Sequence, residues 1–217
     1  KKTMEKLLKR LQAGDDIALI SDAGTPLISD PGYRIVAEAR KREITVAPIP
    51  GACAAIAALS VSGLPTDSFY FGGFLPVKSG QRKTALSALK SSTNTLVFYE
   101  APHRILETVE DLLDVFGGQR QAFMGREISK AFETFLQGDL TQLRQQIAED
   151  SNQQRGEIVL VIAGTDEKAE TSAVDPEMVL KLLLKELPAS KAASLTAKIC
   201  GLDKKAIYQT ALRLQDK

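Results

Sequence analysis

The sequence predicts an α/β fold made of two α/β domains followed by a small helical extension. Short apolar runs that are typical of buried strands alternate with segments of helical periodicity. Loops rich in glycine and proline follow several of these runs, as at the ends of strands in α/β proteins. Beyond residue 175 the pattern is helical only. The clearest apolar runs are 17–20, 44–47, 69–74, 95–99 and 157–163.

Changes in composition divide the chain into four parts. We expect an N-terminal α/β domain over 1–66 and a second α/β domain over 67–164. The polar segment 165–175 (TDEKAETSAVD) predicts a flexible connector. Residues 176–217 predict three helices, and Cys200-Gly201-Leu202-Asp203 between the last two is a turn with a capping aspartate, typical of a helix-turn-helix.

In the first domain, runs 17–20 and 44–47 predict two fully buried parallel strands. A helix is expected over 33–42, with Asp30 as its cap. Parallel sheets bind ligands in the loops at the carboxyl ends of their strands. The loop after each of the two runs is therefore a candidate binding loop.

Composition excludes several classes of protein. The chain has 217 residues, 25% of them charged, with a net charge of +1. It contains no run of eighteen apolar residues and no secretory leader, which predicts a cytoplasmic protein without a membrane span. Two cysteines and one histidine give no metal-ligand pattern, so no metal site is expected. The chain begins at Lys1 rather than at a methionine.

The loop Ser21–Pro26 predicts either a structural turn or a cofactor-binding loop, because Gly24 allows close backbone approach. It lacks the GxGxxG and Walker patterns, which disfavours binding of nucleotide phosphates. The segment 50–54 enters a helix whose first N–H groups could bind a ligand. Cys53 within it is either a reactive thiol or a small buried side chain.

Ionisable side chains lie next to the ends of three later strands. Phe98-Tyr99-Glu100-Ala101-Pro102-His103-Arg104 could form a functional cluster, or Glu100 and Arg104 could simply pair and His103 could pack or cap. The run 125–133 contains Arg126 and Lys130 and is also compatible with a solvated hairpin. Glu157 precedes the last apolar strand and would need a partner if buried.

The helical extension has the highest local positive charge. Residues 176–217 contain eight lysines and arginines against four acids. Lysines on helices are often only solvated, but Lys191, Lys204 and Lys205 are the best candidates for phosphate contacts.

Five segments taken together resemble one family, the ribosomal RNA small subunit methyltransferase I group of the tetrapyrrole methylase superfamily. They occur in the order SDAGTPLISDPG (21–32), PIPGACAA (48–55), FYEAPHR (98–104), GREISKAFE (125–133) and RGEIVLVIAG (155–164). The resemblance covers nearly the whole chain, including the terminal helices.

The resemblance implies two α/β domains of the tetrapyrrole methylase type with S-adenosylmethionine in the cleft between them, and a homodimer. It also implies methylation of the ribose 2′-hydroxyl of a cytidine in the decoding region of 16S rRNA, within the small ribosomal subunit. Thr25 stands where the tetrapyrrole branch has aspartate, which favours RNA over a porphyrin or cobalamin precursor. The family's first strand and its Gly-Asn-Leu loop have no counterpart, so the first domain is expected to be incomplete.

Within that resemblance, each candidate residue has an expected role. Glu100 is the first candidate to accept the hydroxyl proton, followed by Glu157 and His103. Arg104, Arg126 and Lys130 are expected to clamp phosphates or hydroxyls, because their charge persists at neutral pH. The residues expected to bind the cofactor are Asp22, Ala23, Gly24, Thr25, Ile28, Pro50, Gly51, Ala52, Cys53, Ala54 and Tyr99. Two alternatives remain: a methylase of a tetrapyrrole precursor, and a non-catalytic RNA-binding module.

Overall fold

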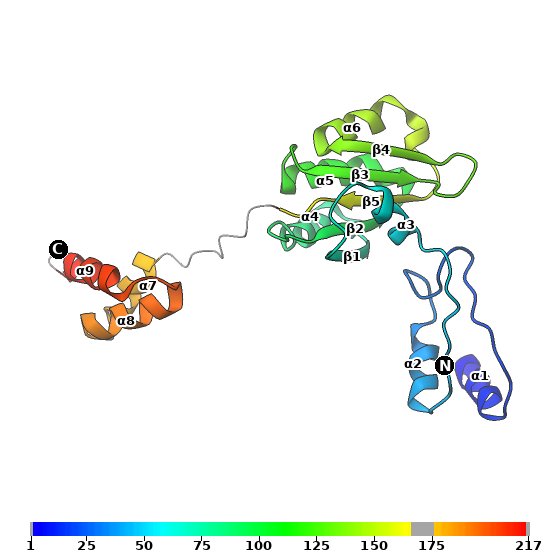
Figure 1. Cartoon of the computed structure of the whole chain (residues 1–217), viewed down its shortest axis with the longest axis horizontal. Helices are drawn as coiled ribbons and strands as arrows, with labels where there is room; N and C mark the ends of the chain where they lie inside the picture. Colours follow the sequence, from blue (N-terminus) through cyan, green and yellow to red (C-terminus); the bar gives the residue numbers. More distant parts are fainter. Residues whose placement is uncertain (1, 166–175, 216–217) are drawn as a thin grey trace. The chain divides into compact units, whose positions relative to one another are not determined.

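The computed structural model describes residues 2–165 and 176–215, and the chain divides into two compact units, Lys1–Thr165 and Asp166–Lys217 (Figure 1). The first unit contains a five-stranded sheet in the order β1-β2-β5-β3-β4. This mixture of strands and helices confirms the predicted α/β class. The strands are β1 (Phe69–Phe74), β2 (Thr95–Glu100), β3 (Gln121–Arg126), β4 (Thr134–Asp139) and β5 (Ile158–Ile162).

The sheet is mixed, whereas the sequence predicted parallel βα units. Only β1 and β2 pair in parallel; the other neighbouring pairs are antiparallel. Each connection that contains a helix still joins strands of the same direction, as such crossovers require. The difference arises because β3 and β4 form a hairpin, which reverses the chain. Strand β5 then enters between β2 and β3 in the reversed direction.

Helices cover both faces of the sheet (Figure 1). One face and its helices form the larger core, in which Leu96, Phe98 and Leu160 are buried. The opposite face packs against α3 through Val97 and Val161. The helical segments of this unit are α1 (Lys2–Gln12), α2 (Tyr33–Lys41), α3 (Ala54–Val61), α4 (Ser79–Ser87), η1 (Pro102–Arg104), α5 (Ile105–Phe116), α6 (Leu140–Glu149) and η2 (Ser151–Gln154).

The two strands predicted at 17–20 and 44–47 are wrong. Both segments lack strand structure, and Ile20 is 85% exposed. An apolar run becomes a strand only when a neighbour completes its hydrogen-bond ladder, and no described residue pairs with either segment. The ordered parts around them are α1 and α2, which pack together through an ion pair of 2.7 Å between Arg42 Nη2 and Glu5 Oε2.

The predicted cap of α2 is also wrong. Gly32, with φ 134°, occupies the N-cap position, and no side chain caps the helix there. A glycine adopts this backbone angle without the penalty that a Cβ atom imposes. Asp30, two residues earlier, instead lines the cavity described below.

The described part of the second unit, 176–215, contains three helices, as predicted: α7 (Pro176–Leu183), α8 (Ala189–Cys200) and α9 (Lys204–Gln215). Its core is formed mainly by Leu180 and the small side chains of α8 and α9. Gly201 ends α8 in the left-handed conformation, and Asp203 Oδ2 accepts a hydrogen bond of 3.0 Å from the N–H of Ala206. The predicted capping turn is confirmed. Most of the predicted connector, 166–175, lies outside the described residues.

A membrane-crossing helix would need a long apolar segment, and none of the helices in 2–165 and 176–215 has one.

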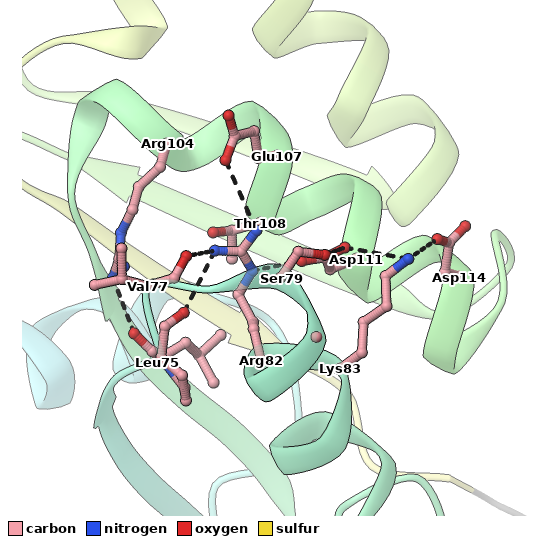
Figure 2. Close-up of polar contacts among 12 residues, drawn as sticks. Leu75, Val77, Ser79, Arg82, Lys83, Arg104, Glu107, Thr108, Asp111 and Asp114 are labelled. Atoms are coloured by element: carbon pink, nitrogen blue, oxygen red, sulfur yellow. Dashed lines mark hydrogen bonds and ion pairs between the residues drawn. The ribbon is translucent and has the colours of Figure 1, made fainter.

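Two buried arginines hold the segment that follows β1 (Figure 2). Arg82, whose side chain is 1% exposed, donates to Asp111 Oδ2 at 2.6 Å and to the carbonyl oxygen of Val77 at 3.1 Å. Arg104 donates to the carbonyl oxygen of Leu75 at 3.0 Å. Because buried carbonyl groups need partners, these contacts fix the path of the chain from β1 into α4.

We expect Asp111→Asn to lower the free energy of unfolding by about 3–5 kcal/mol, because it leaves the buried Arg82 charge with only the exposed carboxylate of Glu107, 3.9 Å away, as an ionic partner. Urea unfolding followed by circular dichroism measures this change. The matched control is Asp114→Asn, whose carboxylate is 62% exposed and pairs with Lys83. That exposed pair should contribute at most about 1 kcal/mol. Equal losses in the two variants would contradict the importance of the buried pair.

Candidate active site at the carboxyl ends of the strands

A cavity of about 500 Å³ lies at one edge of the sheet. Strands β1, β2 and β3 run in the same direction, and their carboxyl ends contribute Phe74, Ala101 and Ile128 to its lining. Gly156 and Glu157 contribute from the segment that enters β5. This volume is within the range of sites for small ligands, and the position is the one at which α/β sheets usually bind them.

Most of the residues expected to bind the cofactor surround this cavity. Those that line it are Asp22, Ala23, Gly24, Thr25, Ile28, Cys53, Ala54 and Tyr99. Pro50, Gly51 and Ala52 are not part of the lining. Ala52 instead contacts a residue of the lining: its carbonyl oxygen accepts a hydrogen bond of 2.9 Å from Thr25 Oγ1. The two loops that the sequence singled out are therefore joined directly.

Backbone strain is concentrated in two of the lining loops. Leu27 and Ser29, with φ 72° and 64°, flank Ile28. Glu127 and Ser129, with φ 51° and 64°, flank Ile128 in the same way. Left-handed conformations cost non-glycine residues about 1–3 kcal/mol each and persist only where the surroundings enforce them, commonly at functional sites. Both isoleucines line the cavity.

Tyr99 faces α3 and the cavity. Its hydroxyl accepts a hydrogen bond of 3.3 Å from the N–H of Ala55 and lies 3.9 Å from Cys53 Sγ. Phe71 and Phe74 pack edge-on against its ring, with centroids at 5.1 and 5.7 Å. Burial, followed by the contact with Cys53, raises the pKa of Tyr99 to about 12. Tyr99 therefore stays neutral at physiological pH and fixes the start of α3.

Glu100 points to the opposite face of the sheet, because neighbouring residues of a strand alternate in direction. Its side chain is fully buried, and Oε1 accepts hydrogen bonds from Arg104 Nε at 2.7 Å and from the N–H of Ala101 at 2.6 Å. Oε2 accepts a hydrogen bond of 2.7 Å from Thr108 Oγ1. With both oxygens engaged and no access to solvent, the geometry argues against Glu100 as the acceptor of a substrate proton.

Most of the other polar residues predicted for the site do not line the cavity. His103 is exposed and does not line the cavity. Arg104 and Arg126 are each 8% exposed, and Arg126 Nη2 donates to the carbonyl oxygen of Phe132 at 2.9 Å. Both guanidinium groups therefore bind internal groups of the protein. Lys191, Lys204 and Lys205 are exposed on α8 and α9 of the second unit.

Glu157, like Asp22, is an exposed acidic residue that lines the cavity, and 71% of the Glu157 side chain is accessible. Its Oε2 lies 3.1 Å from Lys130 Nζ, which also contacts Glu127 Oε1 at 2.9 Å. Sequence reasoning missed Glu127, although it lies within the GREISK run. The place of Glu127 in the site depends on its contact with residue 157, and the sequence gives no signal for that contact.

Metal-ligating side chains do not cluster in the part of the chain that the structure describes: no group of three or more His, Cys, Asp or Glu residues could hold an ion there.

The fold resembles that of solved methyltransferases. The methyltransferase CobJ aligns with a TM-score of 0.55 at 14% identity, covering 75% of this chain and 70% of its own. A uroporphyrin-III-C-methyltransferase from Thermus thermophilus aligns with a TM-score of 0.53 at 20% identity, with the same coverage. Residues 1–144 match the family of Tetrapyrrole (Corrin/Porphyrin) Methylases. The match over residues 1–144 places the chain among the tetrapyrrole methylases, a class of S-adenosylmethionine-dependent enzymes.

Curated relatives narrow the class further. The ribosomal RNA small subunit methyltransferase I of Pseudomonas aeruginosa is 52% identical over 214 residues, which cover 98% of this chain and 76% of that protein. The enzyme of the same name from Escherichia coli O157:H7 is 46% identical, covering 97% and 74%. Residues 170–215 match the RsmI C-terminal HTH domain. The chain belongs to the ribosomal RNA small subunit methyltransferase I family, which confirms the resemblance found in the sequence.

The raised pKa of Tyr99 predicts a late step in the alkaline titration of the protein's tyrosines. We expect Tyr99→Phe to remove the component near pH 12 from the absorbance change at 295 nm, recorded milliseconds after a pH jump, before unfolding. Tyr33→Phe is the control, because Tyr33 is 73% exposed and should leave that component in place. Persistence of the late step in Tyr99→Phe would show that the phenol is not held as described.

Proposed function

We propose that this protein transfers the methyl group of S-adenosylmethionine to the ribose 2′-hydroxyl of a cytidine in the 16S rRNA of the small ribosomal subunit. The observation that carries the proposal is the identity of 52% across 98% of the chain to an enzyme named ribosomal RNA small subunit methyltransferase I. The segments that suggested the family in the sequence also supply most of the cavity lining.

The cavity has the chemistry to hold this cofactor. When bound, S-adenosylmethionine supplies an electrophilic methyl group on a positively charged sulfur. The carboxylates of Asp22 and Asp30 can accept hydrogen bonds from its ammonium or hydroxyl groups. Gly24, with φ +69°, has no Cβ and leaves the adjacent backbone accessible, while Ile28 and Ala54 provide apolar contacts. Pre-formed loops of this kind reduce the entropy cost of ordering a ligand.

Glu157 is the residue best placed to accept the proton of the ribose hydroxyl. A neutral hydroxyl is a weak nucleophile, so its proton must leave as the new oxygen–carbon bond forms. In this step a Glu157 carboxylate oxygen would take the proton while the ribose oxygen forms its bond to the methyl carbon. The carbon–sulfur bond would break, with its electron pair left on the sulfur as a neutral thioether. Glu157 lines the cavity and remains exposed, whereas Glu100 is engaged by Arg104 and Thr108. The remaining catalysis consists largely of holding the acceptor in line.

The charge distribution favours a structured RNA particle over free RNA. A net charge of +1 gives little general attraction to phosphate, so binding must rest on local contacts and shape. Lys191, Lys204 and Lys205 offer exposed ammonium groups for such contacts. We place the reaction in the cytoplasm, where ribosomal subunits are found in bacteria such as those of the relatives, and propose that the enzyme acts as a homodimer.

Transfer of labelled methyl groups tests the function directly. We expect the protein to label the 16S rRNA of undermethylated small subunits, and the label to be found on a cytidine 2′-oxygen after nuclease digestion and mass spectrometry. Porphyrin and cobalamin precursors should remain unlabelled. Transfer to those precursors instead would indicate a small-molecule methylase. Absence of S-adenosylmethionine binding in calorimetry would leave only an RNA-binding module.

We expect Gly24→Ala to weaken S-adenosylmethionine binding about tenfold, because Gly24 lines the cavity with φ +69° and an alanine there would strain the binding loop. Calorimetry measures the change. Gly63→Ala is the matched control: Gly63 has φ +71°, but its Cβ would point into open space away from the cavity. It should share the backbone strain and keep full affinity. Equal weakening in both variants would exclude a specific role for the Gly24 loop.

A further inference from the structure

Glu127 connects the two segments that bring Glu157 to the cavity. It is the first residue after β3, and its side chain is 17% exposed. Its Oε1 accepts a hydrogen bond of 2.9 Å from Lys130 Nζ and another of 2.8 Å from the backbone N–H of Glu157. A single carboxylate oxygen thus holds the ammonium group that pairs with Glu157 and the backbone that carries Glu157.

The backbone around this carboxylate reinforces the same arrangement. The N–H of Glu127 donates to the carbonyl oxygen of Glu157 at 2.9 Å, and the N–H of Lys130 donates to that of Glu127 at 2.9 Å. Gly156 has φ +79°, and a Cβ there would come within 2.5 Å of the Glu127 side chain. Only glycine leaves room for the carboxylate at this point. Because Glu127 itself adopts φ 51°, these contacts must be strong enough to hold a strained residue.

Electrostatic interactions keep both the Glu127 carboxylate and the Lys130 ammonium group charged at neutral pH. The hydrogen bond from Lys130 is the main cause of the lowered pKa of Glu127, assisted by the N–H of Glu157 and the nearby charge of Arg126. Contact with Glu127, followed by contact with Glu157, raises the pKa of Lys130. Lys130 is therefore shared between two carboxylates. Of the two carboxylate oxygens of Glu157, Oε2 contacts Lys130, and Oε1 has no partner among the described residues. Oε1 therefore remains available to a substrate.

We propose that Glu127 is a positioning residue of the methyl-transfer reaction: it holds Lys130 and the backbone of Glu157 so that the Glu157 carboxylate faces the cavity. This inference rests on the proposed function, in which Glu157 accepts the hydroxyl proton. It differs from a purely structural role, in which Glu127 would only stabilise the loop after β3. The two roles predict different kinetics.

Glu127→Gln tests this role, because the amide keeps an acceptor oxygen for the N–H of Glu157 but loses the charge that holds Lys130. We expect kcat for transfer to small subunits to fall about tenfold, part of the 10²–10⁴ that a general base contributes, while KM for S-adenosylmethionine stays within about twofold. The matched control is Glu133→Gln. Glu133 lies in the same loop, and its Oε2 accepts a hydrogen bond of 2.6 Å from the N–H of Ser129 rather than from Lys130 or Glu157. It should retain the wild-type kcat.

A double-mutant cycle separates positioning from loop stability. Glu157→Gln alone should lower kcat about 10²-fold. If Glu127 acts through Glu157, the double variant should be no slower than Glu157→Gln within about threefold, since residues that act as a unit are non-additive. The proposal would be overturned if the decreases in kcat of the two single variants multiplied in the double variant. It would also be overturned if Glu127→Gln had the wild-type kcat.

A readout without catalysis distinguishes failure of this inference from failure of the proposed function. In ¹³C-labelled lysine spectra, Glu127→Gln should lower the pKa of Lys130, and Glu133→Gln should not. An unchanged Lys130 pKa would overturn the coupling between Glu127 and Lys130 even in an active enzyme. If the wild-type protein methylated no small subunit, the proposed function would fail and with it the catalytic part of this inference. The titration would still report whether the contact exists.

Discussion

The buried contact of Glu100 with Arg104 and Thr108 fixes the edge of the sheet on which the cavity depends. Glu100 ends the interior strand β2, and its carboxylate joins that strand to η1 and to α5. Arg104 then extends the contact to the carbonyl oxygen of Leu75, just beyond β1. The ends of two parallel strands are thereby held by one ion pair. Because a buried charge is tolerated only when it is paired, loss of either partner would release both strand ends.

The alternation of strand residues explains why neighbouring positions have different tasks. Tyr99 and Glu100 are adjacent and both border the cavity, yet the Tyr99 hydroxyl contacts α3 on one face of the sheet, while the Glu100 carboxylate is bound to Thr108 of α5 on the other. Ile158 and Arg126 lie in the same cross-strand row as Glu100. Both this row and the row containing Tyr99 and Val159 contribute to the cavity lining, from the two faces of the sheet.

Local sequence patterns predicted most of the strands over 67–164, because these strands combine apolar runs with clear glycine and proline boundaries. Strand β1 was expected at 69–74 and is found there. The same reasoning failed at 17–20 and 44–47, because an apolar run does not reveal whether a pairing neighbour exists. It also ranked Glu100 above Glu157. The sequence shows that both residues are near strand ends, but which carboxylate is buried depends on Arg104 and Thr108, which pack against one of them only in the folded chain.

The two strained loops suggest why the cavity walls need so many cross-contacts. Each wall places an isoleucine between two non-glycine residues with positive φ, at 27–29 and at 127–129. At about 1–3 kcal/mol for each strained residue, neither conformation would persist in an isolated loop. The bond from Thr25 to Ala52 braces the first loop, and the contacts of Glu127 with Lys130 and Glu157 brace the second. A reaction that depends on holding an acceptor in line benefits from walls that are rigid before the substrate arrives, so the same bonds that offset the strain also favour catalysis.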